Sequence, residues 1–257
     1  MRFCSLGSGS TGNATLIEAR GSTRTTRVLV DCGFSLRELE ARALRAGVSL
    51  PDIDAVFVTH EHGDHVGCAL GLARRLAIPL LMSRGTHRAL GAPEAPRLVF
   101  ARDGVAIAVG ELELRPYTVP HDAREPLQLT LTDGALRLGL LTDAGASTPH
   151  LLRQLRECHA LLLECNHDRA LLAASSYPAP LKARIGGRLG HLANDIAAAI
   201  LTECEPGRLR HLVAAHLSER NNTPLLAASA LAAVLNTRHD DIVVADPLAG
   251  FGWLDLG

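Results

Sequence analysis

The 257-residue sequence lacks any apolar run long enough to cross a membrane. A spanning helix needs about 18 or more consecutive apolar residues, and no stretch approaches that composition over that length. Residues 1–5 also lack the charged and apolar regions of a signal peptide. We therefore expect a cytoplasmic protein that has no contact with a membrane.

Paired cysteines and lysine are also scarce. The six cysteines contain no CxxC pair, which argues against a disulfide framework or a thiolate zinc site and predicts mostly buried free thiols. Lys182 is the one lysine among 26 basic residues, so arginine supplies the positive charge and favours forked contacts with anions; genomic base composition is the alternative explanation. Because the formal net charge is −1, no global positive field predicts nucleic-acid binding.

Apolar patterning predicts strands and helices throughout the chain. Strands are expected at residues 13–18, 26–30, 55–58, 80–82, 105–109, 112–119, 127–132, 136–141, 160–163, 209–215 and 242–244. Helices are expected at residues 35–46, 66–77, 148–157, 194–203 and 224–235. No linker, charge run or repeat divides the chain, so we expect a single domain over residues 1–257, with two sheets stacked between helical layers.

One segment concentrates residues that bind metals. The strand predicted at residues 55–58 leads directly into Thr-His-Glu-His-Gly-Asp-His at residues 59–65. The i, i+2 spacing of His60 and His62 points both side chains the same way from extended backbone. Asp64 and His65 follow a turn that glycine permits, toward a second centre. The segment therefore predicts two adjacent metal ions, the alternatives being a solvated polar loop or histidines that serve only as hydrogen-bond partners.

Two features before this segment leave alternatives open. Gly7 to Gly12 spells GxGxxG, but a strand rather than a helix follows it, which argues against a dinucleotide site. The loop is therefore a simple connection between strands or a nest of backbone amides near the active site. Asp31 ends a predicted strand, where it either stabilises a turn or supports a ligand from outside the metal's coordination shell.

The HxHxDH pattern at residues 60–65 resembles the dinuclear motif of the metallo-β-lactamase superfamily. The resemblance implies an α/β fold, an αββα sandwich of two mixed β-sheets between helical layers, with the ligands on loops along one edge. His121, Asp143 and His216 each follow an apolar run, where this fold would place further ligands. Two-metal hydrolysis requires imidazoles for each ion, a bridging carboxylate and an open position for water.

The implied ligands fill two sites. The first ion would take His60, His62 and His121, the second would take Asp64, His65 and His216, and Asp143 would bridge them. Zinc or manganese is expected, and iron also suits mixed imidazole and carboxylate ligands.

Three residues are expected to take part in catalysis: Asp64, His191 and Glu164. Gly190-His191-Leu192 precedes a predicted helix and is similar to the Gly-His-Ser/Thr segment whose histidine donates a proton in superfamily phosphodiesterases. Glu164 follows a buried strand and could orient His191 or share its proton. The alternative is an ordinary histidine before a helix.

A basic segment just before His191 supplies candidate substrate-binding residues. Lys182, Arg184 and Arg188 fall within seven positions, where they could hold a phosphate by local charge despite the net charge of −1. The alternative is a solvated helix or loop face.

Longer segments resemble a narrower group. SLGSGSTGN, THEHGDH, PHDAREP, LTDAG, LLLECNHD, GHLAN and AHLSERNNTP are together similar to the YycJ/WalJ group of bacterial metallo-β-lactamase-fold proteins, which are regarded as 5′-to-3′ DNA exonucleases. Departures are modest: Gly63 stands where serine is usual, and Ala14 and Ala193 stand where cysteine and serine are expected. The intervals between His121, Asp143 and His216 leave no room for the β-CASP insertion or the RNase Z arm.

The resemblance implies a dinuclear metal-dependent phosphodiesterase that uses a metal-activated hydroxide, with DNA favoured over RNA as the substrate. Protein partners are not indicated by the sequence. One alternative is a thioester, lactone or β-lactam hydrolase of the same fold, which would need no proton donor at His191. A second alternative is a catalytically silent, metal-bound scaffold.

Overall fold

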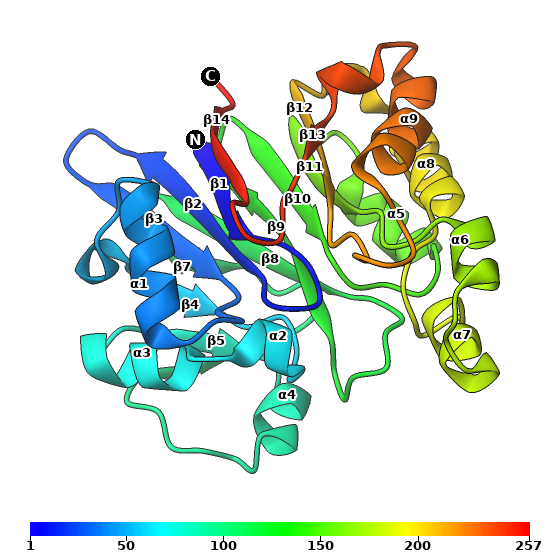
Figure 1. Ribbon diagram of the computed structural model, residues 1–257. Helices are drawn as coiled ribbons and strands as arrows, with labels where there is room; N and C mark the ends of the chain where they lie inside the picture. The colour runs from blue at the N-terminus through cyan, green and yellow to red at the C-terminus, as the bar shows by residue number, and fades with distance from the viewer.

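Two seven-stranded β-sheets lie face to face between layers of helices in the computed structural model, which describes residues 1–257 (Figure 1). Helices α1 (Leu36–Arg45) and α3 (Ala69–Leu76) pack on the outer face of the first sheet. Helices α5 (Pro149–Leu155), α8 (Asn194–Glu203) and α9 (Pro224–Leu235) pack on the outer face of the second. This arrangement confirms the expected αββα sandwich.

The two sheets are built alike, each with an antiparallel half and a parallel half. In spatial order, the first sheet contains β14 (Phe251–Asp255), β1 (Arg2–Gly7), β2 (Ala14–Arg20), β3 (Thr25–Val30), β4 (Ala55–Phe57), β5 (Leu80–Met82) and β6 (Leu98–Phe100). The second contains β13 (Val243–Val244), β12 (His211–Ala215), β11 (Ala160–Glu164), β10 (Arg137–Leu141), β9 (Leu127–Thr132), β8 (Leu112–Thr118) and β7 (Ile107–Val109).

Alternation along the strands builds separate apolar cores. Phe3 and Ile17 point between the two sheets, whereas their neighbours Cys4 and Leu16 point to the layer of α1 and α3. Successive side chains of a strand face opposite sides, so a strand buried on both faces is apolar at nearly every position. This explains why β4 and β11 are almost continuously hydrophobic.

The helices include four short ones near the strand ends: α2 (Gly63–Val66), α4 (Arg84–Ala89), α6 (Arg169–Ala174) and α7 (Ala179–Ile185). The longest helix, α9, has 12 residues, and none could reach across a lipid bilayer. Thr223 caps α9 by accepting from Leu226 N at 3.2 Å, as its position before Pro224 predicts. All six cysteines are free, and five are buried.

The helix expected over residues 66–77 forms as α3 but starts later than expected, because the chain breaks between α2 and α3 at Gly67. Gly67 has a φ of +26°, and a β-carbon there would lie 2.2 Å from the carbonyl oxygen of Cys32. That same oxygen accepts a hydrogen bond from Cys68 N at 3.0 Å. The break therefore docks α2 onto the loop that follows β3.

The sequence patterns also missed several short elements. Strands β6 and β14 and helices α4, α6 and α7 were not expected. Strand β6 has three residues, and α7 has no buried residue, so neither carries the apolar periodicity on which prediction depends.

A buried carboxylate joins three strands of the first sheet. Glu18 on β2 is 1% exposed and forms ion pairs with Arg2, Arg20 and Arg27 at 2.8 to 3.0 Å. Burial alone would raise the pKa of Glu18, but the hydrogen bonds from these arginines lower it to about 2. The pairs therefore stabilise the fold while Glu18 is ionised.

We predict that Glu18→Gln lowers the free energy of unfolding at pH 7 by about 1–3 kcal/mol. Since the folded-state pKa lies below the unfolded one, this stabilisation is present above about pH 4.5 and is lost as the pH falls toward 2. Urea unfolding from pH 7 to pH 3 measures this loss, with Glu40→Gln as the control because the Glu40 side chain on α1 is 44% exposed. If the difference in free energy of unfolding between wild type and Glu18→Gln does not decrease below pH 4.5, the ion pairs of Glu18 are not the source of this stabilisation.

Candidate metal centre

One edge of the sandwich collects the residues that the sequence nominates as ligands. The loop after β4 carries His60 and His62, and α2 carries Asp64 and His65. The remaining three follow β8, β10 and β12: His121, Asp143 and His216. Strands β8, β10 and β12 run in the same direction within the second sheet, so their carboxyl ends lie at this same edge. The structure therefore brings all seven side chains together.

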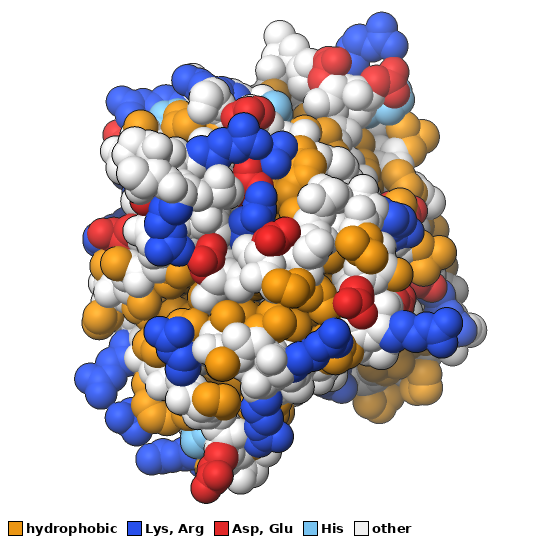
Figure 2. Space-filling view, turned by 90° about the vertical axis from the view of Figure 1, so that its left-hand side faces the viewer, with side chains coloured by type: hydrophobic (Ala, Val, Ile, Leu, Met, Phe, Trp, Pro, Cys, Tyr) orange, Lys and Arg blue, Asp and Glu red, His pale blue; other side chains and the backbone are white.

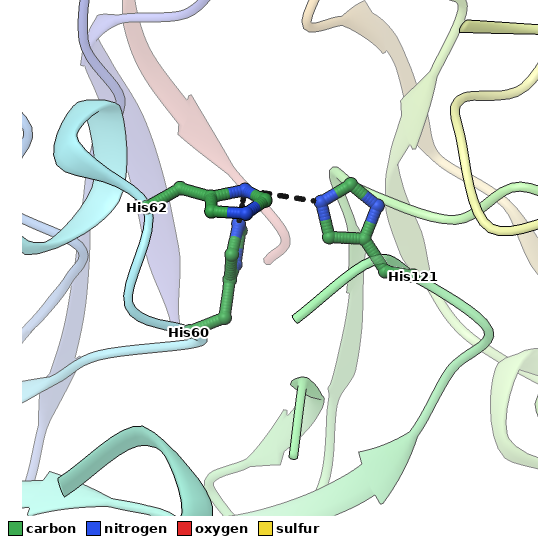
Figure 3. Close-up of side chains that lie close together, drawn as sticks. All are labelled: His60, His62 and His121. Atoms are coloured by element: carbon green, nitrogen blue, oxygen red, sulfur yellow. Dashed lines mark hydrogen bonds between the residues drawn. The ribbon is translucent and has the colours of Figure 1, made fainter. Parts of the chain in front are cut away.

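Three imidazoles form the first cluster (Figure 3). The Nδ1 atom of His62 lies 3.0 Å from Nε2 of His60 and 3.3 Å from Nε2 of His121. The rings of His60 and His121 are buried, and that of His62 is partly exposed. Three ring nitrogens that converge in this way match the donor set of an imidazole-rich metal site.

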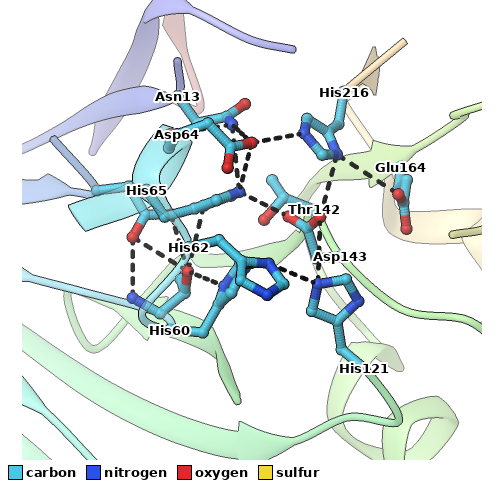
Figure 4. Close-up of polar contacts among 12 residues, drawn as sticks. Asn13, His60, His62, Asp64, His65, His121, Thr142, Asp143, Glu164 and His216 are labelled. Atoms are coloured by element: carbon cyan, nitrogen blue, oxygen red, sulfur yellow. Dashed lines mark hydrogen bonds and ion pairs between the residues drawn. The ribbon is translucent and has the colours of Figure 1, made fainter. Parts of the chain in front are cut away.

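The second cluster contains Asp64, His65 and His216 (Figure 4). Oδ2 of Asp64 lies 3.4 Å from Nε2 of His65 and 3.5 Å from Nε2 of His216. Asp143 lies between the clusters, with Oδ2 at 3.0 Å from Nε2 of His65 and Oδ1 at 3.8 Å from Nε2 of His121. Its two oxygens therefore face both groups of imidazoles, as a bridging carboxylate must.

The far side of several rings is held by a second hydrogen-bonding group. Nδ1 of His65 lies 2.8 Å from Oδ2 of Asp31, and Nδ1 of His121 lies 3.0 Å from the carbonyl oxygen of Gly190. An Nδ1–H that donates to these oxygens leaves Nε2 unprotonated toward the cluster. Asp31 also accepts from the backbone and hydroxyl of Thr59. Of the two roles considered for Asp31, its contacts match support of a ligand.

His216 has an unusual backbone that neighbouring loops stabilise. Its φ of +54° is rare for a residue with a side chain. Its backbone N–H donates to Ser8 Oγ at 2.9 Å, and its carbonyl oxygen accepts from Asn166 Nδ2 at 3.0 Å. The glycine-rich loop after β1 therefore reaches this cluster through Ser8, and through Asn13, whose Nδ2 lies 3.2 Å from Nε2 of His65.

The protonation preferences of the two clusters differ. Burial lowers the pKa of His60 and of His121, so both rings are neutral and able to donate a lone pair. Burial would also lower the pKa of His216, yet Asp143 and Asp64 raise it to about 10. His216 and His65 in turn hold the pKa of Asp143 well below its usual range despite burial. The second cluster therefore demands positive charge beside its carboxylates.

The donor set fits two divalent cations. Oδ2 of Asp143 and Nε2 of His216 are buried, and neither forms a hydrogen bond although His65 and Asp64 lie 3.0 and 3.5 Å from them. Unsatisfied polar atoms at such depth are costly unless a ligand or ion takes them. Four carboxylates lie in or beside the two clusters, and two divalent ions would balance their negative charge: Asp31, Asp64, Asp143 and Glu164. The residues of this edge therefore fit divalent metal ions.

His191 and Glu164 form a hydrogen-bonded pair beside the second cluster. Nδ1 of His191 lies 2.7 Å from Oε1 of Glu164, which is fully buried. Oε2 of Glu164 accepts from the backbone of Ala144 at 2.9 Å and of Leu192 at 3.3 Å. Burial would lower the pKa of His191, but Glu164 raises it above its usual value. Both oxygens of Glu164 are therefore occupied by hydrogen bonds, although the pair also lies within reach of Asp143 and His216.

A cavity of about 370 Å³ opens over the two clusters. Arg184 of α7 is on its wall, together with His191 and the apolar side chains of Leu181 and Ile185. Lys182 and Arg188 are not among its lining residues. Lys182 instead donates to the carbonyl oxygen of Ala173 at 2.6 Å, which ties α7 to α6. Of the three basic residues nominated for substrate binding, Arg184 alone faces the cavity.

Two acidic residues near the site were not identified from the sequence. Glu61 accepts from Arg124 N at 2.7 Å and from Thr86 Oγ1 at 3.3 Å, which joins the motif to the loop after β8 and to α4. Asp122 lines the cavity and pairs with Arg184. Both residues lie next to predicted ligands in the sequence, and this is the feature from which their place at the site could have been predicted.

We predict that Asp31→Asn weakens the affinity for one of two metal ions by about 10- to 100-fold, because the amide holds the ring of His65 less strongly than the carboxylate. Asparagine tolerates the φ of +64° at this position, so the backbone should be retained. Competition between the protein and a chelator for Zn²⁺ or Mn²⁺ measures the affinity. Asp103→Asn removes an exposed Asp–His pair of similar length, with His150, and serves as the control. Equal affinities in Asp31→Asn and wild type would reject this role.

Comparison with known proteins identifies the family. The model of the Beta-lactamase superfamily domain matches residues 26–217, a range that includes all seven clustered ligand candidates. Exodeoxyribonuclease YycJ of Bacillus anthracis is 30% identical over 243 residues, which cover 93% of this chain and 90% of that protein. Exodeoxyribonuclease WalJ of Streptococcus pneumoniae serotype 2 is 29% identical over 232 residues, which cover 88% and 85%.

A solved structure agrees on the fold. The metallo-beta-lactamase fold protein YhfI of Bacillus subtilis superposes with a TM-score of 0.74 at 16% identity, over 99% of both chains. These findings confirm the resemblance drawn from the sequence motifs. The chain belongs to the beta-lactamase superfamily, in which it is a metal-dependent hydrolase of the metallo-β-lactamase fold.

Proposed function

We propose that this hydrolase cleaves phosphodiester bonds in nucleic acid and acts as a 5′-to-3′ DNA exonuclease in the cytoplasm. The observation that carries the proposal is the pair of His191 and Glu164, which stands on the wall of the cavity beside the two ligand clusters. A carbonyl substrate with a good leaving group needs no such proton donor, whereas an alkoxide leaving group does.

The residues of the two clusters would share two divalent ions. His60, His62 and His121 would hold one, and Asp64, His65 and His216 the other, with Asp143 as the bridge. Two ions bound there would polarise a phosphoryl oxygen and lower the pKa of water. Imidazole and carboxylate donors accept zinc, manganese or iron, and zinc or manganese is proposed.

The side chain of His191 would deliver the proton. Its Nδ1–H donates to Glu164, so Nε2 is the nitrogen free to carry a second proton. The raised pKa of His191 favours this doubly protonated form. Hydroxide adds to phosphorus as the bond to the leaving oxygen breaks, and His191 gives that oxygen its proton from Nε2. The proton that water lost when the hydroxide formed passes to solvent. Glu164 stabilises the charged ring before the transfer.

The surroundings of the cavity suit a nucleic-acid end rather than a long duplex. A volume of about 370 Å³ is near the lower limit for ligand pockets, so it accommodates a small part of a polymer. The face covered by α1 and α3 shows basic side chains spread among acidic and apolar ones, without a continuous basic stripe (Figure 2). Since the formal net charge is −1, local contacts such as Arg184 would have to hold the phosphates. DNA is proposed over RNA because the relatives at about 30% identity are named exodeoxyribonucleases.

We predict metal-dependent cleavage of end-labelled DNA, with mononucleotides released from the 5′ end. His191→Ala should reduce kcat by about 10² to 10⁴-fold while the bound metal is unchanged, since this ring donates a proton but binds no ion. Single- and double-stranded DNA and RNA, S-lactoylglutathione and nitrocefin, each tested with Zn²⁺, Mn²⁺ and Mg²⁺, complete the assay. His150→Ala removes an exposed histidine that also pairs with a carboxylate and provides the control.

Each outcome of this assay separates the candidates. Thioester or β-lactam turnover that is unaffected by His191→Ala would replace the phosphodiesterase with a carbonyl hydrolase. Cleavage of RNA but not DNA would correct the substrate. Inactivity on every substrate, with two ions bound, would favour a metal-bound scaffold.

A further inference from the structure

We propose that Asp122 is a positioning residue that holds Arg184 at the mouth of the cavity, where the guanidinium receives a substrate phosphate. This inference rests on the proposed nucleic-acid substrate. It assigns a role to the residue that directly follows the ligand candidate His121, and it links α7 to the edge that carries the metal centre.

The contact joins two distant parts of the chain. Nε of Arg184 donates to Oδ2 of Asp122 at 2.7 Å. The other oxygen of Asp122 lies 3.5 Å from Nε2 of His121 and 3.9 Å from Nε2 of His62. Asp122 therefore stands between the first imidazole cluster and the arginine, and both members of the pair line the cavity.

Arg184 needs such a partner because little else fixes its side chain. The side chain is 65% exposed, and its helix has no buried residue that would anchor it. An arginine side chain loses up to about 2 kcal/mol of conformational freedom when it is held in one geometry. Because the ion pair with Asp122 already restricts the side chain, little of this freedom is left to lose when substrate binds. The affinity for substrate is therefore higher.

The geometry leaves the guanidinium able to bind an anion. Asp122 accepts from Nε, and no hydrogen bond of the structure uses Nη1 or Nη2 of Arg184. A guanidinium has five N–H donors, so its forked end remains free for two phosphate oxygens. The pair is partly exposed, with Asp122 at 27%, and its own contribution to fold stability is small. The role of the pair is to orient the guanidinium of Arg184.

The test is a double-mutant cycle on metal-loaded protein. Asp122→Asn, Arg184→Ala and the double variant are compared for binding of a 5′-phosphorylated single-stranded oligonucleotide with phosphorothioate linkages that resist cleavage. We expect each single change to raise Kd by about 3- to 30-fold, and the double variant to bind no more weakly than Arg184→Ala, because both changes disable the same contact. With the cleavable oligonucleotide, Asp122→Asn should raise KM and leave kcat nearly unchanged.

Salt dependence supplies a readout that a structural defect would not alter. Loss of one phosphate contact should reduce the slope of log affinity against log salt by about 0.7 in both single variants. Arg24→Ala and Asp54→Asn form the matched control, since that pair has a similar contact of 2.8 Å and similar exposure. Arg24 precedes β3 and Asp54 precedes β4, so the pair lies at the opposite end of these strands from the motif.

Several results would overturn the inference. Asp122→Asn that binds as tightly as wild type, or more tightly, would show that the carboxylate repels the substrate rather than orienting Arg184. If the increase in Kd of the double variant equals the product of the two single increases, Asp122 and Arg184 contribute to binding independently. Loss of metal from Asp122→Asn would assign the carboxylate to the metal centre. Failure of wild type to bind or cleave any nucleic acid would instead reject the proposed function.

Discussion

Buried carboxylates that need positive charge are the constraint on which this edge of the molecule depends. Asp31, Asp143 and Glu164 are almost fully removed from water, and Asp64 lies beside them. Ionised groups at that depth destabilise a fold unless they are paired or bind a cation. The histidines supply part of the compensation, as the raised pKa of His216 shows. Two divalent ions would supply the rest, so metal binding and the stability of this edge should be coupled.

The fold meets this constraint by bringing strand ends together with close backbone contacts. Helix α2 lies so near the loop after β3 that a β-carbon on Gly33 would be 1.8 Å from the carbonyl oxygen of Asp64. That oxygen also accepts from the backbone of Asn13 at 2.8 Å. Ligands from α2, β10 and β12 thereby occupy one small volume although they are far apart in the sequence. Rigid strands and packed loops, rather than the ligands themselves, set the distances between the two clusters.

The sequence allowed the sandwich and the ligand clusters to be predicted because each ligand follows a clear apolar strand or lies in the HxHxDH motif. It did not reveal what Asp122 or Ser8 contacts, since their partners come from segments far along the chain. The two roles of Asp31 could be separated once its distance to His65 was known. Helix α7 was missed because it buries no side chain, yet it carries the arginine that faces the cavity. Local patterns thus predicted the side chains that cluster at this edge better than those that line the cavity.

The central claim is that Asp143 joins two metal ions at this edge. Crystals of the protein grown with Mn²⁺ or Zn²⁺, with diffraction recorded on both sides of the metal absorption edge, test it directly. The account predicts two anomalous peaks about 3.5–4 Å apart, one among His60, His62 and His121, the other among Asp64, His65 and His216, with Asp143 in contact with both. A single peak, or ions held by His191 and Glu164 in place of these residues, would contradict it.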